Sequence, residues 1–86
     1  MSMFKIPTIH LNGTGKQTLL DGCQTAREAL SNAKEKLMAA APNGRDYYPQ
    51  GDGAYEVARL EHGQRLARIE QVIVELDIVM EGIVDQ

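Results

Sequence analysis

The chain has little of what usually holds a small protein together. Its 86 residues include one cysteine, Cys23, and no tryptophan. A single cysteine excludes an internal disulfide framework, and His10 and His62 lie too far apart in the sequence to carry the ligand spacing of a structural metal. One domain of this length, residues 1–86, has a marginal core when it folds alone. We therefore expect a homo-oligomer.

Long hydrophobic runs are also missing. The N-terminus, MSMFKIPTIHLNG, has no apolar run of signal-peptide length, and the run Val72-Ile73-Val74 in the C-terminal half is far too short for a membrane span. The formal net charge of −3 disfavours long nucleic acid as a partner. A lone cysteine fits a reducing compartment. These features predict a cytoplasmic protein that binds neither membranes nor long nucleic acid.

No catalytic, metal or cofactor motif is found in the chain. The stretch Gly13–Thr18 is similar to the end of a phosphate-binding loop, but that motif needs glycine where His10 stands and Ser or Thr where Gln17 stands. Cys23 has no histidine or other base at a spacing that would activate it. We therefore expect no enzyme, no catalytic residues, no metal and no cofactor. Lys16, at the start of the first predicted helix, remains a candidate to bind an anion.

The first predicted helix covers residues 15–41. Thr14 and Gln17 match a capping box at its start, and Pro42 favours its end. Its apolar positions follow a heptad pattern and are Leu19, Cys23, Ala26, Leu30, Ala33, Leu37 and Ala40. Because alanine recurs at every seventh position, a partner helix could approach this seam closely.

The second predicted helix covers residues 54–84, with Asp52 as its N-cap. Its seam comprises Leu66, Ile69, Ile73, Leu76, Met80 and Ile83. Val72, Val79 and Val84 widen this seam, which is typical of a helix buried on two sides, so we expect a second protomer to cover part of it. Val72–Val74 and Ile78–Val79 also have strand propensity, but the helical spacing persists for about eighteen residues and favours a helix.

Together these segments predict an all-α fold. Two long antiparallel helices form a helical hairpin, joined by the loop 42–53 and preceded by an extended N-terminal arm, residues 1–13. The arm contains Pro7, so it is expected to be extended or a short edge strand. The hairpins are expected to assemble into an oligomeric bundle.

The loop carries the strongest candidate for a binding site. Its core reads NGRDYYPQGDG, from Asn43 to Gly53. Arg45 could bind a phosphate or carboxylate through two hydrogen bonds, and Tyr47 or Tyr48 could stack on a base. Alternatively, Arg45 pairs with Asp46 and the tyrosines close the hydrophobic core, or the loop contacts another protein.

A second group of candidates lies on the second helix. Arg59, His62 and Arg65 follow one another at three-residue spacing, which predicts a stripe on one face. His62 also falls on the backward extension of the apolar seam. An ordinary solvated charged face is the alternative. In the functional interpretation, this stripe meets the Arg45–Tyr48 loop of another protomer and completes an anion pocket, to which Lys16 is a further candidate contributor.

The whole chain resembles a family of small phage and prophage proteins. The resemblance is carried by Ile9-His10-Leu11-Asn12-Gly13-Thr14, by Asn43-Gly44-Arg45-Asp46-Tyr47-Tyr48-Pro49, and by the Glu61-His62 pair. It implies a phage source and assigns no activity or site residue. Some phage oligomers of similar size and helix content sequester cyclic nucleotide or ADP-ribose signals of bacterial immunity, and that analogy extends to size, origin and pocket chemistry alone.

These observations lead to one functional hypothesis and two alternatives. The hypothesis is a non-catalytic counter-defence protein that sequesters a small phosphorylated, nucleotide-type ligand between protomers. The first alternative is an inhibitor that docks on a host protein through the acidic face carrying Glu75, Asp77 and Glu81. The second is a structural or assembly factor.

Overall fold

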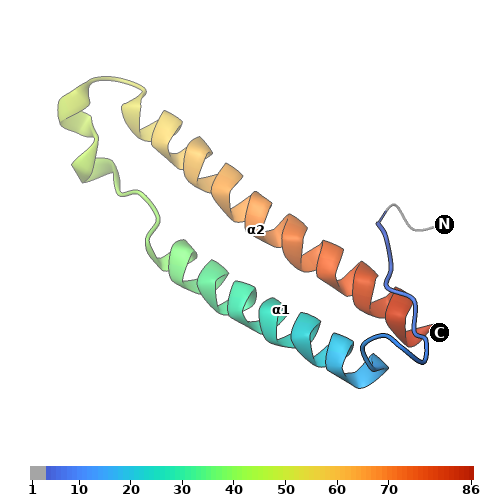
Figure 1. Ribbon diagram of the computed structural model, residues 1–86. Helices are drawn as coiled ribbons and strands as arrows, with labels where there is room; N and C mark the ends of the chain where they lie inside the picture. Colours follow the sequence, from blue (N-terminus) through green and yellow to red (C-terminus); the bar gives the residue numbers. More distant parts are fainter. Residues whose placement is uncertain (1–3) are drawn as a thin grey trace.

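The computed structural model describes residues 4–86 as a helical hairpin (Figure 1). Helix α1 spans Lys16–Ala39, shorter at both ends than the expected range 15–41. Helix α2 spans Ala54–Val84, the range expected from the sequence. Two short 3-10 helices, η1 (Gly44–Asp46) and η2 (Tyr48–Gln50), lie between them. The molecule is elongated, with extents of 62 × 24 × 16 Å. The predicted all-helical hairpin is confirmed, and no strand occurs within residues 4–86. Residues 1–3 of the expected arm lie outside the described residues.

The seam of α2 forms the centre of the small core. Ile83 is fully buried, Ile73 is 4% exposed and Ala58 is 8% exposed. On α1, by contrast, no residue is fully buried, and the positions that are half-buried toward α2 include Leu19, Cys23, Leu30 and Leu37. The alanines expected on the same seam, Ala26, Ala33 and Ala40, are exposed. That part of the predicted seam was wrong, because Arg27 and Lys34, each one residue after an expected seam alanine, are half-buried and contact α2 instead.

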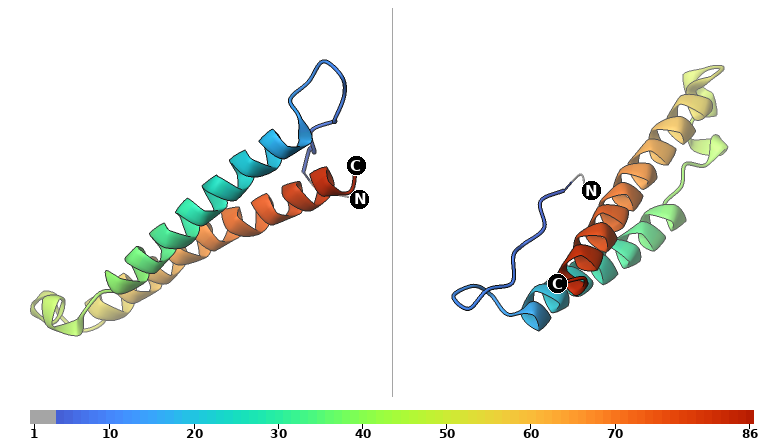
Figure 2. Two further views of the ribbon diagram at one scale, coloured as in Figure 1. Left: turned by 90° about the horizontal axis from the view of Figure 1, so that it is seen from below. Right: turned by 90° about the vertical axis from the view of Figure 1, so that its right-hand side faces the viewer.

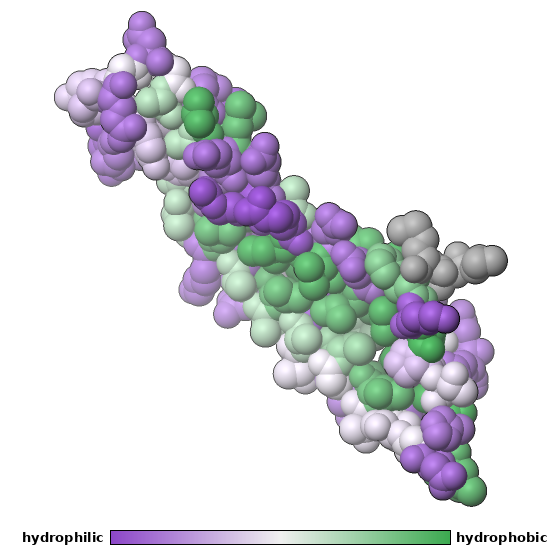
Figure 3. All heavy atoms as spheres, turned by 45° about the horizontal axis from the view of Figure 1, so that its top comes forward, coloured by the Kyte–Doolittle hydropathy of each residue, from purple (hydrophilic) through white to green (hydrophobic). Residues whose placement is uncertain are grey.

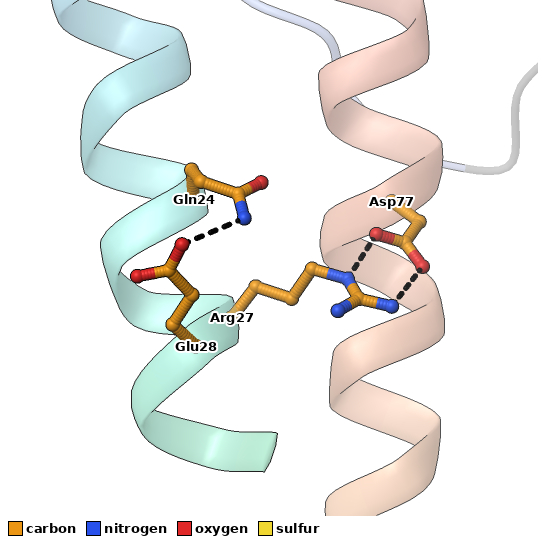
Figure 4. A network of polar contacts seen from close by, with 4 residues as sticks. All are labelled: Gln24, Arg27, Glu28 and Asp77. Atoms are coloured by element: carbon orange, nitrogen blue, oxygen red, sulfur yellow. Dashed lines mark hydrogen bonds and ion pairs between the residues drawn. The ribbon is translucent and has the colours of Figure 1, made fainter. Parts of the chain in front are cut away.

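Two ion pairs fix the register of the hairpin. Arg27 binds Asp77 through two hydrogen bonds of 2.5 and 3.2 Å (Figure 4). Lys34 Nζ lies 2.8 Å from Glu70 Oε2. Both pairs lie on the same side of the seam. We call this side, with Arg27, Lys34, Glu70 and Asp77, the ion-pair face.

The opposite side of the hairpin carries exposed alanines on α1 and, on α2, Val72 flanked by Arg65, Arg68 and Glu75. Successive residues on a helix are about 100° apart, so Ala26 and Arg27 lie on opposite flanks of α1. The same rotation puts Val72 and Asp77 on opposite flanks of α2. Because the helices are antiparallel, the flanks of Ala26 and Val72 share one side of the hairpin. We call this side, defined by Ala26, Ala33, Ala40 and Val72, the alanine face.

The arm packs against the C-terminal end of α2 (Figures 1 and 2). A Cβ atom on Gly82 would lie 2.8 Å from Ile6 Cγ1, so the absence of a side chain makes room for Ile6. The Gln86 side chain accepts a hydrogen bond from Ile9 N at 2.9 Å and donates one to Pro7 O at 2.6 Å. Part of the outer side of α2 is therefore covered by the chain's own arm.

Both predicted side-chain caps are absent. The N-cap residue of α1 is Gly15, without a side-chain hydrogen bond, and Gln17 donates instead to Asp21 at 2.7 Å. At the start of α2 the N-cap residue is Gly53, whose φ of 87° favours glycine, and Asp52 does not cap the helix. The helix starts therefore depend on glycine geometry and on packing.

Candidate functional site

The loop between the helices is built from two tight turns. The Asn43 side chain accepts a hydrogen bond from Arg45 N at 3.0 Å and starts η1. Pro49 lies in the first turn of η2, and Gly51, with φ of 105°, ends it. Tyr48 begins this second turn and is 76% exposed. The loop therefore has a defined backbone and presents one tyrosine to solvent.

The loop side chains divide between the two interpretations made from the sequence. Tyr47 is half-buried, as is Tyr55 in the first turn of α2, which fits tyrosines that cover the core. Arg45 and Tyr48 are exposed. Within residues 4–86, no ion pair joins Arg45 to Asp46, so the local pair considered as an alternative does not form. Arg45 and Tyr48 remain accessible for binding.

The predicted stripe on α2 is divided by the burial of its middle residue. His62 is 8% exposed, and its Nε2 atom makes no hydrogen bond with any described residue. Because His62 points into the seam, Arg59 and Arg65 lie about 120° apart, one on each side of it. Arg59 pairs with Glu56 at 2.9 Å, which raises the pKa of Arg59 through the hydrogen bond and then through charge. Arg65 makes no ion pair within residues 4–86.

Lys16 lies at the other end of the molecule from the loop. Its Nζ atom donates to Val84 O at 2.9 Å, at the C-terminus of α2. The last turn of α2 contains no basic residue of its own, so Lys16 supplies the positive charge that the helix dipole favours there. The 31 residues of α2 span about 46 Å, and this length separates Lys16 from the loop within one chain.

The acidic face expected on α2 is only partly free. Asp77 is engaged by Arg27, and its carboxylate raises the pKa of Arg27 through the hydrogen bond first and charge second. Glu75 is half-buried, whereas Glu81 and Asp85 are exposed. The predicted acidic face is therefore interrupted at Asp77, because a cation on the facing helix binds this carboxylate.

The polar residues that hold the arm and register the helices were not among the sequence candidates. Arg27 and Lys34 are seven residues apart on α1, and Glu70 and Asp77 are seven apart on α2. Matching charges at heptad spacing on two antiparallel helices could have revealed both ion pairs. By contrast, the clamp formed by Gln86 has no local pattern, because its partners are backbone groups nearly eighty residues away.

Apolar side chains are exposed around the candidate site. Met38 is 55% exposed, Val57 is 57% exposed and Leu60 is 58% exposed, all toward the loop end of the two helices. Figure 3 shows apolar surface near this end and again in the middle of the molecule, with a hydrophilic band between the two. The helix ends next to the loop therefore expose apolar side chains as well.

Comparison with protein-family models, curated proteins and solved structures finds no match for the chain. The described residues of the single chain enclose no pocket, and among them no three His, Cys, Asp or Glu side chains gather as a metal site. Neither helix combines the length and hydrophobicity needed to cross a membrane.

Proposed function

We propose that this protein is a homo-oligomeric, non-catalytic binding protein whose ligand is a small phosphorylated, nucleotide-type molecule. The observation that supports the proposal best is the pair formed by Arg45 and Tyr48. Tyr48 is 76% exposed on an ordered turn, and Arg45 has no ion-pair partner within residues 4–86. A large aromatic ring and an uncommitted guanidinium suit a ligand with one flat and one anionic part.

In this proposal, Arg45 and Tyr48 bind different parts of the ligand, as the chemistry of each side chain favours. The Arg45 guanidinium donates two parallel hydrogen bonds to a phosphate, and the Tyr48 ring stacks on the base. In this proposal a second protomer closes the site. A protein of this kind acts by sequestering its ligand, and a counter-defence role against a nucleotide immune signal in the host cytoplasm is the setting that the resemblance to phage proteins suggests.

An inhibitor that docks on a host protein through its acidic helix is the second candidate. The free carboxylates of Glu81 and Asp85 favour it. It is weaker than the first, because Asp77 already neutralises Arg27 across the hairpin and Glu75 is half-buried. No particular contact favours a purely structural or assembly role.

Calorimetric titration tests the proposed ligand class. The probes are ADP-ribose, a cyclic dinucleotide and inorganic phosphate, each added to the intact chain and to the Arg45→Ala and Tyr48→Ala variants. A hydrogen bond to a charged group contributes about 1.5–3 kcal/mol, so Arg45→Ala should weaken nucleotide binding at least tenfold. Tyr48→Ala should weaken nucleotide binding and leave phosphate binding unchanged.

The matched control is Lys34→Ala, which removes the same charge from the ion-pair face, away from the loop. Circular dichroism establishes that each variant remains helical. If neither nucleotide binds, or if Lys34→Ala weakens binding as much as Arg45→Ala, the proposed ligand site is wrong. Capture of a host protein that is lost on reversal of Glu81 and Asp85 would favour the inhibitor instead.

A further inference from the structure

We infer that a second copy of the chain docks on the alanine face in the antiparallel orientation, so that the loop of each copy lies beside the Lys16 end of the other. In such a pair α1 packs on α1 and α2 packs on α2 of the second copy. The inference rests on the proposed oligomer and specifies its interface, but it does not depend on the identity of the ligand.

The first reason is the exposed area of the single chain. A compact monomer of 9.5 kDa exposes about 5,000 Å². This chain exposes 6459 Å², an excess of roughly 1,400 Å² over that expectation. Permanent homodimers bury about 2,000 Å² or more in total from their two subunits. The excess is therefore large enough to supply a stable interface from each copy.

The second reason is the composition of the alanine face. Ala26, Ala33 and Ala40 are exposed at heptad spacing, and Val72 is 44% exposed beside them. Helices whose contacts are small residues can approach to the lower end of the usual 8–10 Å between axes. The ion pairs across the hairpin are on the other side, so the α1 half of this face presents alanines, while Arg68 and Glu75 flank Val72 on its α2 half.

The register of the hairpin determines which residues of α1 and α2 on this face lie at the same level, meaning the same height along the hairpin axis. Since Lys34 is level with Glu70, Ala33 lies within about one residue, or 1.5 Å, of the level of Val72. The middle of the alanine stripe and the exposed valine therefore mark one point along the hairpin. A two-fold axis that lies along the face at this level, at right angles to the helices, places Ala33 opposite Ala33 and Val72 opposite Val72 of the second copy.

Charge selects the antiparallel orientation. Lys36 and Arg68 lie on the loop side of this axis, are level with each other and make no ion pair within residues 4–86. In a parallel pair, α1 packs on α2 of the second copy, and Lys36 of one copy faces Arg68 of the other. In the antiparallel pair, Arg68 is instead level with Glu75 of the second copy. Like charges are thereby separated and opposite charges are brought together.

The orientation has a consequence for the candidate site. Lys16 lies about 25 Å from Ala33 along α1, so in the antiparallel pair it is level with the loop of the second copy. The turn before α1 includes Leu11, which is 98% exposed. Lys16 and the Arg45–Tyr48 loop, which one chain holds at opposite ends, meet in two identical composite sites.

Disulfide trapping tests the orientation without any ligand. Cys23 is replaced by alanine, and single cysteines are introduced as Ala33→Cys, Ala40→Cys and Val72→Cys. A disulfide needs Cα atoms roughly 4.4–6.8 Å apart. In the antiparallel pair Ala33 and Val72 each meet their own copy, so both variants should form covalent dimers under mild oxidation. Ala40 is about 10 Å further along the helix and should not.

Each of the other outcomes overturns the inference. A disulfide that forms between Ala33→Cys and Val72→Cys chains, and not within either variant alone, indicates the parallel pair. No dimer with any variant shows that this face is not an interface. Because trapping is read as covalent mass, it can succeed when nucleotide binding fails, and it can fail when binding to Arg45 and Tyr48 persists.

Discussion

The two long faces of the hairpin differ in how many of their side chains have partners within the chain. On the ion-pair face, Arg27 and Lys34 find partners on α2, and Lys16 caps the C-terminus of that helix. On the alanine face, three alanines and Val72 stay exposed, and Arg65 lies at this side without a partner within residues 4–86. Both faces belong to the same two helices, so helix propensity does not explain the difference.

This difference indicates that the two faces have different structural roles. The ion-pair face specifies how the two helices of one copy align, because two charge pairs seven residues apart fit one register. The alanine face offers close approach without specifying an internal partner. We interpret the first as the device that forms the hairpin and the second as the surface that joins two hairpins.

The largest expected effect comes from a charge on the alanine face. Ala33→Glu would bury a carboxylate between two copies, and an unpaired buried charge costs about 3–5 kcal/mol, so the pair should dissociate. The matched change Ser31→Glu is exposed on the opposite flank and should shift stability by no more than about 0.5 kcal/mol. Size-exclusion chromatography and thermal unfolding measure both. Equal behaviour of the two variants would remove the distinction between the faces.

A smaller effect, and a gain, is expected at the seam between the faces. His62 is 8% exposed with Nε2 unpaired, and an unsatisfied buried polar group costs about 1–3 kcal/mol. His62→Leu should therefore raise the free energy of unfolding by about 1 kcal/mol, and His62→Asn should not. Urea unfolding at fixed protein concentration gives the comparison. A loss of stability in His62→Leu would mean that His62 finds a hydrogen-bond partner in the assembled protein.

The smallest effect is expected from the ion-pair face. The side chains of Arg27 and Asp77 are 35% and 45% exposed, so solvent weakens the pair. Arg27→Gln should lower the melting temperature slightly, and the difference should shrink as salt is added. Arg59→Gln removes the same charge from a pair within one helix and should have less effect. A loss in Arg27→Gln that does not change with salt would mean that packing of the side chain, and not charge, joins the helices.

The sequence predicts the helices well because their periodicity is local. Ile73 and Ile83 stand at regular spacing, and both are buried. The assignment of faces was less successful, since Ala26 and Arg27 both fit a heptad pattern with Leu30, and the ion pair of Arg27 with Asp77 on α2 places Arg27 on the seam. The arm was predicted as extended, but its place against Gly82 depends on a contact across most of the chain length, which no local pattern encodes.

The residues of the candidate site also differ in how far the local sequence predicts their placement. The exposure of Tyr48 follows from the turn-forming residues around it, Pro49 and Gly51, and these were visible in the sequence. The burial of His62 was indicated by its place on the extended seam, although the same residue also fitted a charged stripe. Lys16 could not be assigned from the sequence, because its hydrogen bond to Val84 O joins residues 68 positions apart.

Sedimentation equilibrium of the intact chain, at several micromolar concentrations and in physiological salt, tests the central claim that the alanine face joins two copies. The account predicts a mass close to twice 9.5 kDa in the absence of any ligand, and a return to the single-chain mass in the Ala33→Glu variant. A folded, helical protein that sediments with the mass of one chain throughout this range would contradict it.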